Sequence, residues 1–117
     1  MQTAKFRQAL PFQALGDETR LRVMRLLIAA AGPLRAGQLA ETVGVPPSHL
    51  SRHLQILDAA GLTSTVRTGK TRYISARLAN RENESLCAAV LALEDETQVF
   101  SEDVERLGRL SGLGVET

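Results

Sequence analysis

The sequence has little of several residue types on which common functional sites depend: it has one cysteine, two histidines, one tyrosine and no tryptophan among 117 residues. A single cysteine cannot form an internal disulfide or supply a cysteine-based metal site by itself. Charged residues interrupt the apolar runs well before the ~20 residues that a membrane-spanning helix needs. Lys5 and Arg7 also break up the apolar stretch typical of a secretory signal. We therefore expect a cytoplasmic protein with no membrane segment.

The length and charge distribution favour one small domain with a basic middle. A chain of this length corresponds to a single domain, which we place at residues 1–107, followed by a glycine-containing flexible tail at 108–117. Residues 48–77 carry five basic side chains against Asp58 alone, whereas residues 78–117 have a net charge of −6. A locally basic segment is a candidate surface for binding a polyanion, and the alternative is an unevenly charged solvated surface.

Hydrophobic periodicity and turn residues predict a mainly helical fold with one β-hairpin. Helices are expected at 11–15, from Asp17 to the Gly32-Pro33 break, around 39–43 before Gly44, from Pro47 to Gly61, and at 83–100. Residues 62–67 follow a period of two, and residues 71–76 after the Thr68-Gly69-Lys70 turn are rich in β-forming residues, so the two segments predict a hairpin. A short helix, a tight glycine turn and a helix with a polar outer face form a helix-turn-helix. The hairpin behind it would be the wing of a winged helix-turn-helix.

Several segments resemble the ArsR/SmtB family of bacterial winged-helix repressors. They are residues 12–22 (FQALGDETRLR), 38–41 (QLAE), 48–57 (SHLSRHLQIL), Ala60-Gly61-Leu62, Gly69-Lys70 and Arg72-Tyr73. The resemblance covers roughly residues 8–78, with the segments in the family's order. It implies a homodimer that binds a palindromic operator on double-stranded DNA and leaves it when an inducer binds or reacts.

The predicted DNA-contacting residues lie on one helix and on the wing. On the helix the candidates are polar side chains opposite the leucines, and on the wing they are basic or aromatic: Ser48, His49, Ser51, Arg52, Gln55, Arg67, Lys70, Arg72 and Tyr73. Arginine pairs well with guanine and glutamine with adenine, whereas wing residues would contact phosphate or the minor groove. Each could instead be a solvated surface residue. His53 lies near the core side of its helix, so it makes either a structural hydrogen bond or a DNA contact.

The metal ligands typical of the family are missing from their usual places. Residues 39–45 contain no cysteine or histidine, and no histidine follows His53. His49 and His53 are four residues apart on a helix but have no third ligand, so we predict no metal site and no cofactor.

Cys87 has two open interpretations. It lies early in the last predicted helix, where the helix dipole could lower its pKa and make it a redox or thiol sensor. Its neighbours Leu86, Ala88 and Ala89 are apolar, and a free cysteine is often a small buried hydrophobe. The sequence leaves open whether the inducer acts through Cys87, is a small organic molecule, or does not exist.

The dimer interface is predicted on the terminal helices. We expect the dimer to form through an apolar stripe on the last predicted helix, which consists of Leu86, Val90 and Leu93. The N-terminal helix around Phe6, Leu10 and Phe12 would assist it.

An enzymatic function is not expected. We find no Ser/His/Asp set, no glycine-rich phosphate loop and no paired carboxylates. The acidic run Glu94-Asp95-Glu96 is interpreted as a solvated part of a helix. The alternatives to an inducible DNA-binding repressor are a winged-helix protein-interaction module and a thiol-responsive repressor that uses Cys87.

Overall fold

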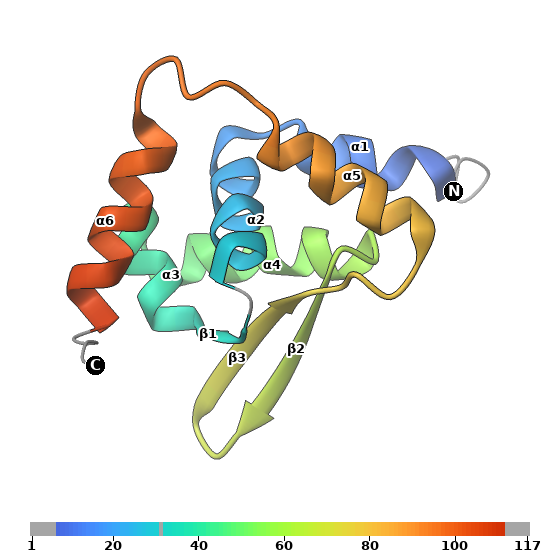
Figure 1. Ribbon diagram of the computed structural model, residues 1–117. Coiled ribbons are helices and arrows are strands. Elements are labelled where there is room, and N and C mark those ends of the chain that lie inside the picture. The colour runs from blue at the N-terminus through green and yellow to red at the C-terminus, as the bar shows by residue number, and fades with distance from the viewer. Residues whose placement is uncertain (1–6, 31, 112–117) are drawn as a thin grey trace.

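The computed structural model describes residues 7–30 and 32–111 as helices around a small sheet (Figure 1). The elements in chain order are α1 (Leu10–Leu15), α2 (Glu18–Ala30), β1 (Leu34–Arg35), α3 (Ala36–Val43), α4 (Pro47–Ala59), β2 (Thr63–Thr68), β3 (Thr71–Ala76), α5 (Arg81–Leu91) and α6 (Val99–Ser111). The mainly helical winged helix-turn-helix predicted from the sequence is confirmed. None of the helices in the described residues is long and apolar enough to cross a membrane.

The core lies between α2, α3 and α4, with the base of the sheet and one face of α5 closing it. Leu50, Leu54 and Leu57 are at most 1% exposed, which confirms the predicted inner face of α4. Local residues set where these helices begin and end. Asp17 caps α2 by accepting a hydrogen bond from the Arg20 backbone N–H at 3.1 Å. Gly44 ends α3 in the left-handed conformation, at φ 76°.

The three strands form an antiparallel sheet in the order β1-β3-β2. The hairpin β2–β3 was predicted, and its register pairs Val66 with Tyr73 around a turn containing Gly69. It projects away from the helices as a wing (Figure 1). Strand β1 was not predicted, because two residues are too few to show an alternating pattern. It pairs Arg35 with Tyr73, which places the start of α3 next to the wing.

The prediction of one long helix at 83–100 is wrong, because α5 ends at Leu91 and α6 begins at Val99. The Arg25 guanidinium donates to the carbonyls of Val90 and Leu93 at 3.0 and 3.1 Å, so that it satisfies groups exposed at the end of α5. The acidic run 94–96 then lies in the connection, and Asp95 accepts hydrogen bonds from two backbone N–H groups at the start of α6. Carboxylates are unfavourable at a helix C-terminus and favourable at an N-terminus, so this charge pattern supports two helices.

Helix α6 packs back against α2 and α3 rather than continuing outward (Figure 1). Arg22 of α2 forms a two-bond ion pair with the buried Asp103. Arg106 donates to the carbonyl of Thr42 in the last turn of α3, at 2.7 Å. Helix α6 continues to Ser111, so residues 108–111, which we expected in a flexible tail, are helical. Residues 112–117 lie outside the described part of the chain.

Candidate nucleic-acid interface

The outer face of α4 is polar and free of the core. Ser48, His49, Arg52 and Gln55 are exposed, and Ser51 is half-buried. Because the leucines of the opposite face fill the core, this orientation of α4 is fixed by packing. All five candidates thus lie on or beside one exposed helical surface that offers hydrogen-bond donors and acceptors.

The wing contributes positive charge beside that surface. Arg67 and Lys70 are exposed, whereas Tyr73 and Arg72 are half-buried. The Arg72 guanidinium donates a hydrogen bond of 2.9 Å to Ser51 Oγ. Two predicted DNA-contacting residues therefore bind each other, and this bond joins the wing to α4.

The base of the wing is fixed to the end of α4 by Asp58. Its carboxylate accepts hydrogen bonds from the hydroxyls of Thr63 and Thr65 on β2, the latter at 3.0 Å. Sequence reasoning had assigned Asp58 no role. Hydrogen bonds of Ser51 in the first half of α4 and of Asp58 near its end thus join the helix to the wing.

His53 lies on the inner side of the helix-turn-helix. Its Nδ1 is 3.1 Å from Arg20 Nη1 and 3.8 Å from an Asp17 carboxylate oxygen. Of the two sequence-based alternatives, these contacts favour the structural one. In residues 7–30 and 32–111, no group of three or more His, Cys, Asp or Glu side chains is arranged to hold a metal ion.

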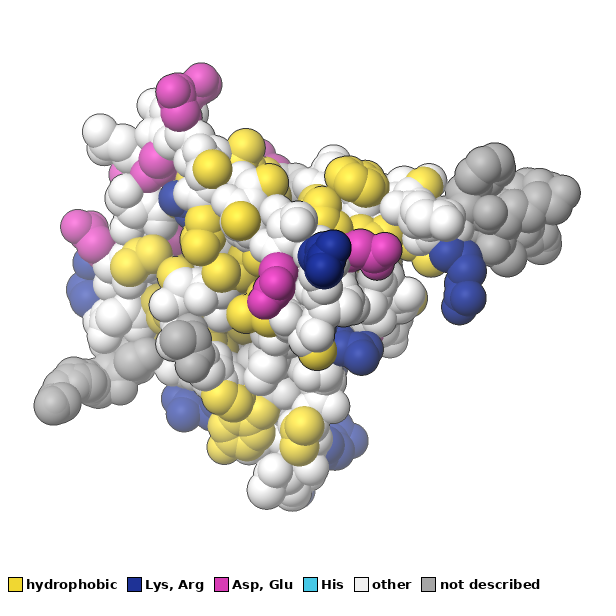
Figure 2. Space-filling view, turned by 45° about the vertical axis from the view of Figure 1, so that its right-hand side comes forward, with side chains coloured by type: hydrophobic (Ala, Val, Ile, Leu, Met, Phe, Trp, Pro, Cys, Tyr) yellow, Lys and Arg dark blue, Asp and Glu magenta, His cyan; other side chains and the backbone are white. Residues whose placement is uncertain are grey.

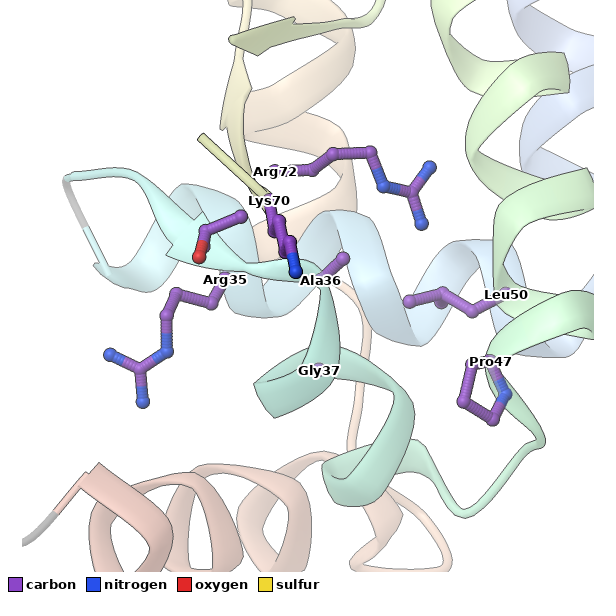
Figure 3. A pocket seen from close by; sticks show the side chains of 8 residues that line it. Arg35, Ala36, Gly37, Pro47, Leu50, Lys70 and Arg72 are labelled. Carbon is purple, nitrogen blue, oxygen red and sulfur yellow. The ribbon is translucent and has the colours of Figure 1, made fainter. Parts of the chain in front are cut away.

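Arg35 belongs to this surface, and sequence reasoning missed it. The residue is exposed at the end of β1, and its backbone N–H donates to Gln38 Oε1 at 3.1 Å. Together with Lys70 and Arg72 it lines a cavity between the wing and the starts of α3 and α4 (Figure 3). The sequence does not indicate that Arg35 lies next to the wing, because only the β1–β3 pairing brings it there.

The predicted dimer residues are divided between surface and interior. Phe12 is 65% exposed and Leu93 is 43% exposed, whereas Val90 is 4% exposed and packs within its own chain. Leu10 and Leu86 are half-buried, and Phe6 lies outside the described residues. Leu91, which was not predicted, is as exposed as Leu93. Hydrophobic side chains gather across the upper part of the view in Figure 2.

Cys87 is a buried residue of α5. It is 4% exposed and belongs to the hydrophobic core. Burial raises the pKa of its thiol, since the charged thiolate loses water. The sequence had allowed the opposite shift from the helix dipole. A neutral, covered thiol is a poor nucleophile, so the structure favours the inert interpretation.

Three comparisons with known proteins agree with this geometry. A helix-turn-helix domain family matches residues 15–66. The HTH-type transcriptional regulator YceK of Bacillus subtilis is 36% identical over 66 residues, which cover 56% of this chain and 66% of that protein. The transcriptional repressor SdpR of the same organism is 36% identical over 64 residues, covering 55% of this chain and 69% of the repressor. The chain thus spans about two thirds of the length of these relatives.

Solved structures show the same fold. The homodimeric winged helix-turn-helix DNA-binding domain of Mb0332 from Mycobacterium bovis, a possible ArsR-family regulator, superposes with a TM-score of 0.62 and 22% identity. The match covers 99% of this chain and 93% of that domain. Its identity is low, so it supports the fold, while the curated relatives carry the family. The functions of these relatives are regulatory rather than enzymatic. The chain belongs to the helix-turn-helix transcriptional regulators, and its fold is the winged helix-turn-helix of Mb0332.

Proposed function

We propose that the protein represses transcription as a homodimer, that its two α4 helices read the half-sites of a palindromic operator, and that an inducer releases it. The observation that carries the proposal is the exposed polar face of α4 next to a basic wing. Arg52 and Gln55 lie on that face and have the donor patterns that suit guanine and adenine. Lys70 and Arg67 on the wing suit phosphate or the minor groove.

Dimerisation follows from the hydrophobic residues that the single chain leaves exposed. Phe12 of α1, Leu91 of α5 and Leu93 just after α5 offer exposed apolar surface. The homodimeric state of Mb0332 supports the same arrangement here. A two-fold dimer would present its α4 helices to half-sites one helical turn apart, about 10–10.5 bp, or a multiple of it.

Release of the repressor from DNA requires a binding site for the inducer. A cavity of about 760 Å³ lies between α1 and the start of α5, beside Phe12 and Leu86. This volume suits a small organic molecule, and the position next to the proposed dimer surface would couple its binding to DNA affinity. A compound that raises the melting temperature and lowers operator affinity would identify the inducer.

Selection of duplexes from a random library tests the DNA-binding part. We expect the wild-type protein to enrich an inverted repeat with the spacing given above. Arg52→Gln should weaken binding by about 1–3 kcal/mol and relax the preference at one base pair of each half-site. Arg77→Gln is the matched control, since Arg77 is exposed at the base of the wing, at the opposite end of β3 from the turn.

Two outcomes would contradict the proposal. An enriched site without two-fold symmetry would exclude the symmetric dimer on DNA. Binding to DNA releases counterions from the neutralised phosphates, so the affinity must fall as the salt concentration rises. Negligible affinity at low salt, or an affinity that does not depend on salt, would favour the protein-interaction module instead.

A further inference from the structure

A cavity of about 340 Å³ lies at the junction of the wing with the helix-turn-helix (Figure 3). It is lined by residues from the ends of four elements: Arg35, Gly37, Pro47, Leu50, Lys70 and Arg72. These elements are far apart in sequence, and the short β1–β3 pairing brings the first of them to the wing. The cavity is therefore a product of the tertiary fold.

The charge of the cavity is positive and uncompensated. None of its lining residues is acidic, and in the described part of the chain no carboxylate forms an ion pair with Arg35, Lys70 or Arg72. In Figure 3 the side chain of Lys70 lies between those of Arg35 and Arg72, whose guanidinium groups point to opposite sides of the view. Three cationic side chains line this cavity, so it favours a compact anion with several acceptor oxygens, and phosphate is one of the anions that arginine binds with two donors.

The start of α3 adds to this preference. Ala36 and Gly37 form the first turn of the helix, where backbone N–H groups have no partner within the helix and the dipole favours negative charge. Gly37 is exposed, and a Cβ added there would meet no atom within 4 Å. The cavity is thus open at the point where a ligand would approach the helix.

The position of the cavity identifies the source of the phosphate. Arg72, which lines it, is bonded to Ser51 on α4, so the cavity adjoins the surface that would read the bases. We propose that it binds one phosphodiester group of the operator backbone in each half-site, and that Arg35 is a phosphate-binding residue of the repressor. This inference rests on the proposed function. The contact would set the register of α4 in the groove without reading sequence.

Neutral backbone substitutions test the proposal directly. A set of duplexes, each with a methylphosphonate at one position of the selected operator, is titrated with wild type and with Arg35→Gln. One position per half-site should weaken the wild type clearly more than Arg35→Gln, because the variant has already lost one of the contacts to that phosphate. At 0.15 M salt we expect Arg35→Gln to lose about fivefold in affinity per protomer, and the salt slope to fall by about 0.9 per protomer. Operator and unrelated DNA should weaken by the same factor.

A pair of substitutions at Gly37 provides an independent arm. Gly37→Asp places a carboxylate at the cavity, where it should stabilise the first turn of α3 yet weaken DNA binding at least as much as Arg35→Gln. Gly37→Ala adds only a methyl group and should bind DNA like the wild type. A higher melting temperature together with a lower DNA affinity in Gly37→Asp cannot come from misfolding. For Arg35→Gln, the variant Arg77→Gln again controls for the loss of one positive charge.

The outcomes separate the two levels of the proposal. If the wild type fails to bind duplex DNA, the proposed function is wrong. If the wild type binds but Arg35→Gln keeps its affinity, salt slope and full methylphosphonate profile, the phosphate site is wrong and the function stands. NMR of the Gly37 amide measures whether inorganic phosphate binds at the cavity. Tight phosphate binding there, with unchanged DNA affinity of Arg35→Gln, would assign the cavity to a free anion and overturn the proposed contact with the DNA backbone.

Discussion

Arg22 of α2 binds both carboxylate oxygens of Asp103 on α6, with Nη2 2.8 Å from Oδ1 and Nε 2.9 Å from Oδ2. The two residues are 81 positions apart, and the Asp103 side chain is 1% exposed. The hydrogen bond to Asp103 raises the pKa of Arg22. This contact fixes the C-terminal helix to the body that carries α4.

We expect Asp103→Ala to lower the free energy of unfolding by about 3 kcal/mol, because it leaves the Arg22 guanidinium without its carboxylate in a mostly buried position. Urea denaturation followed by circular dichroism measures the change. Glu102→Ala is the control, since Glu102 is an exposed acid of the same helix and its removal should cost well under 1 kcal/mol. Equal losses in the two variants would show that the ion pair contributes nothing specific.

The bond between Arg72 and Ser51 predicts coupling between the wing and α4. Arg72→Gln and Ser51→Ala should each weaken operator binding by about fivefold, on the scale of one hydrogen bond to a charged group. The double variant should lose clearly less than the sum of the two single losses, because both substitutions remove the same bond between Arg72 and Ser51. Gel-shift titrations of the four proteins measure the coupling. The control is the double variant of Ser48→Ala and Arg72→Gln, whose loss of affinity should equal the sum of the two single losses. If the losses of Ser51→Ala and Arg72→Gln also add up fully, the bond between Ser51 and Arg72 does not position the wing.

The proposed dimer predicts that a charge on exposed apolar residues of α1 or of the end of α5 gives monomers. Phe12→Glu and Leu93→Glu should each shift the protein to the monomer in sedimentation velocity, because burying an unpaired carboxylate in an interface costs several kcal/mol. Val66→Glu is the matched control: Val66 is 61% exposed but lies on the wing. A dimer that persists in Phe12→Glu and Leu93→Glu would place the interface elsewhere on the molecule.

Burial of Cys87 predicts slow thiol chemistry and a defined pH dependence. The native protein should react with a disulfide reagent at pH 8 at least tenfold more slowly than the urea-unfolded chain, because its raised pKa keeps the thiol neutral. In the unfolded chain the thiol ionises near its ordinary pKa of ~8.5. The stability that the neutral buried thiol contributes is therefore complete below that pH and is lost as the pH rises towards the raised value.

Operator binding provides the second measurement on Cys87. Cys87→Ala should bind the operator like the wild type, and peroxide should release neither protein. Release of the wild type alone by peroxide would identify Cys87 as a sensor and contradict the inert interpretation.

Local sequence determined the helix-turn-helix and the wing. Proline at the start of α4, left-handed glycines at 44 and 61, and leucines at helical spacing act within a few residues of themselves. The orientation of α4 follows from the same leucines, so the exposed positions of Ser48, Arg52 and Gln55 could be predicted. The period of two in residues 62–67, the turn at Gly69 and the β-forming residues 71–76 likewise specified the hairpin.

Tertiary contacts decided the end of the chain and the charge of the interface. The pattern Leu86, Val90 and Leu93 is compatible with one long helix, but Arg25, more than 60 residues earlier, binds the carbonyls of Val90 and Leu93, where α5 ends. Arg35 reaches the wing through a two-residue strand that has no recognisable pattern. Periodicity reports which face of an element is apolar, whereas the partner of a given arginine depends on which distant segments pack together, and that is settled only when the core closes.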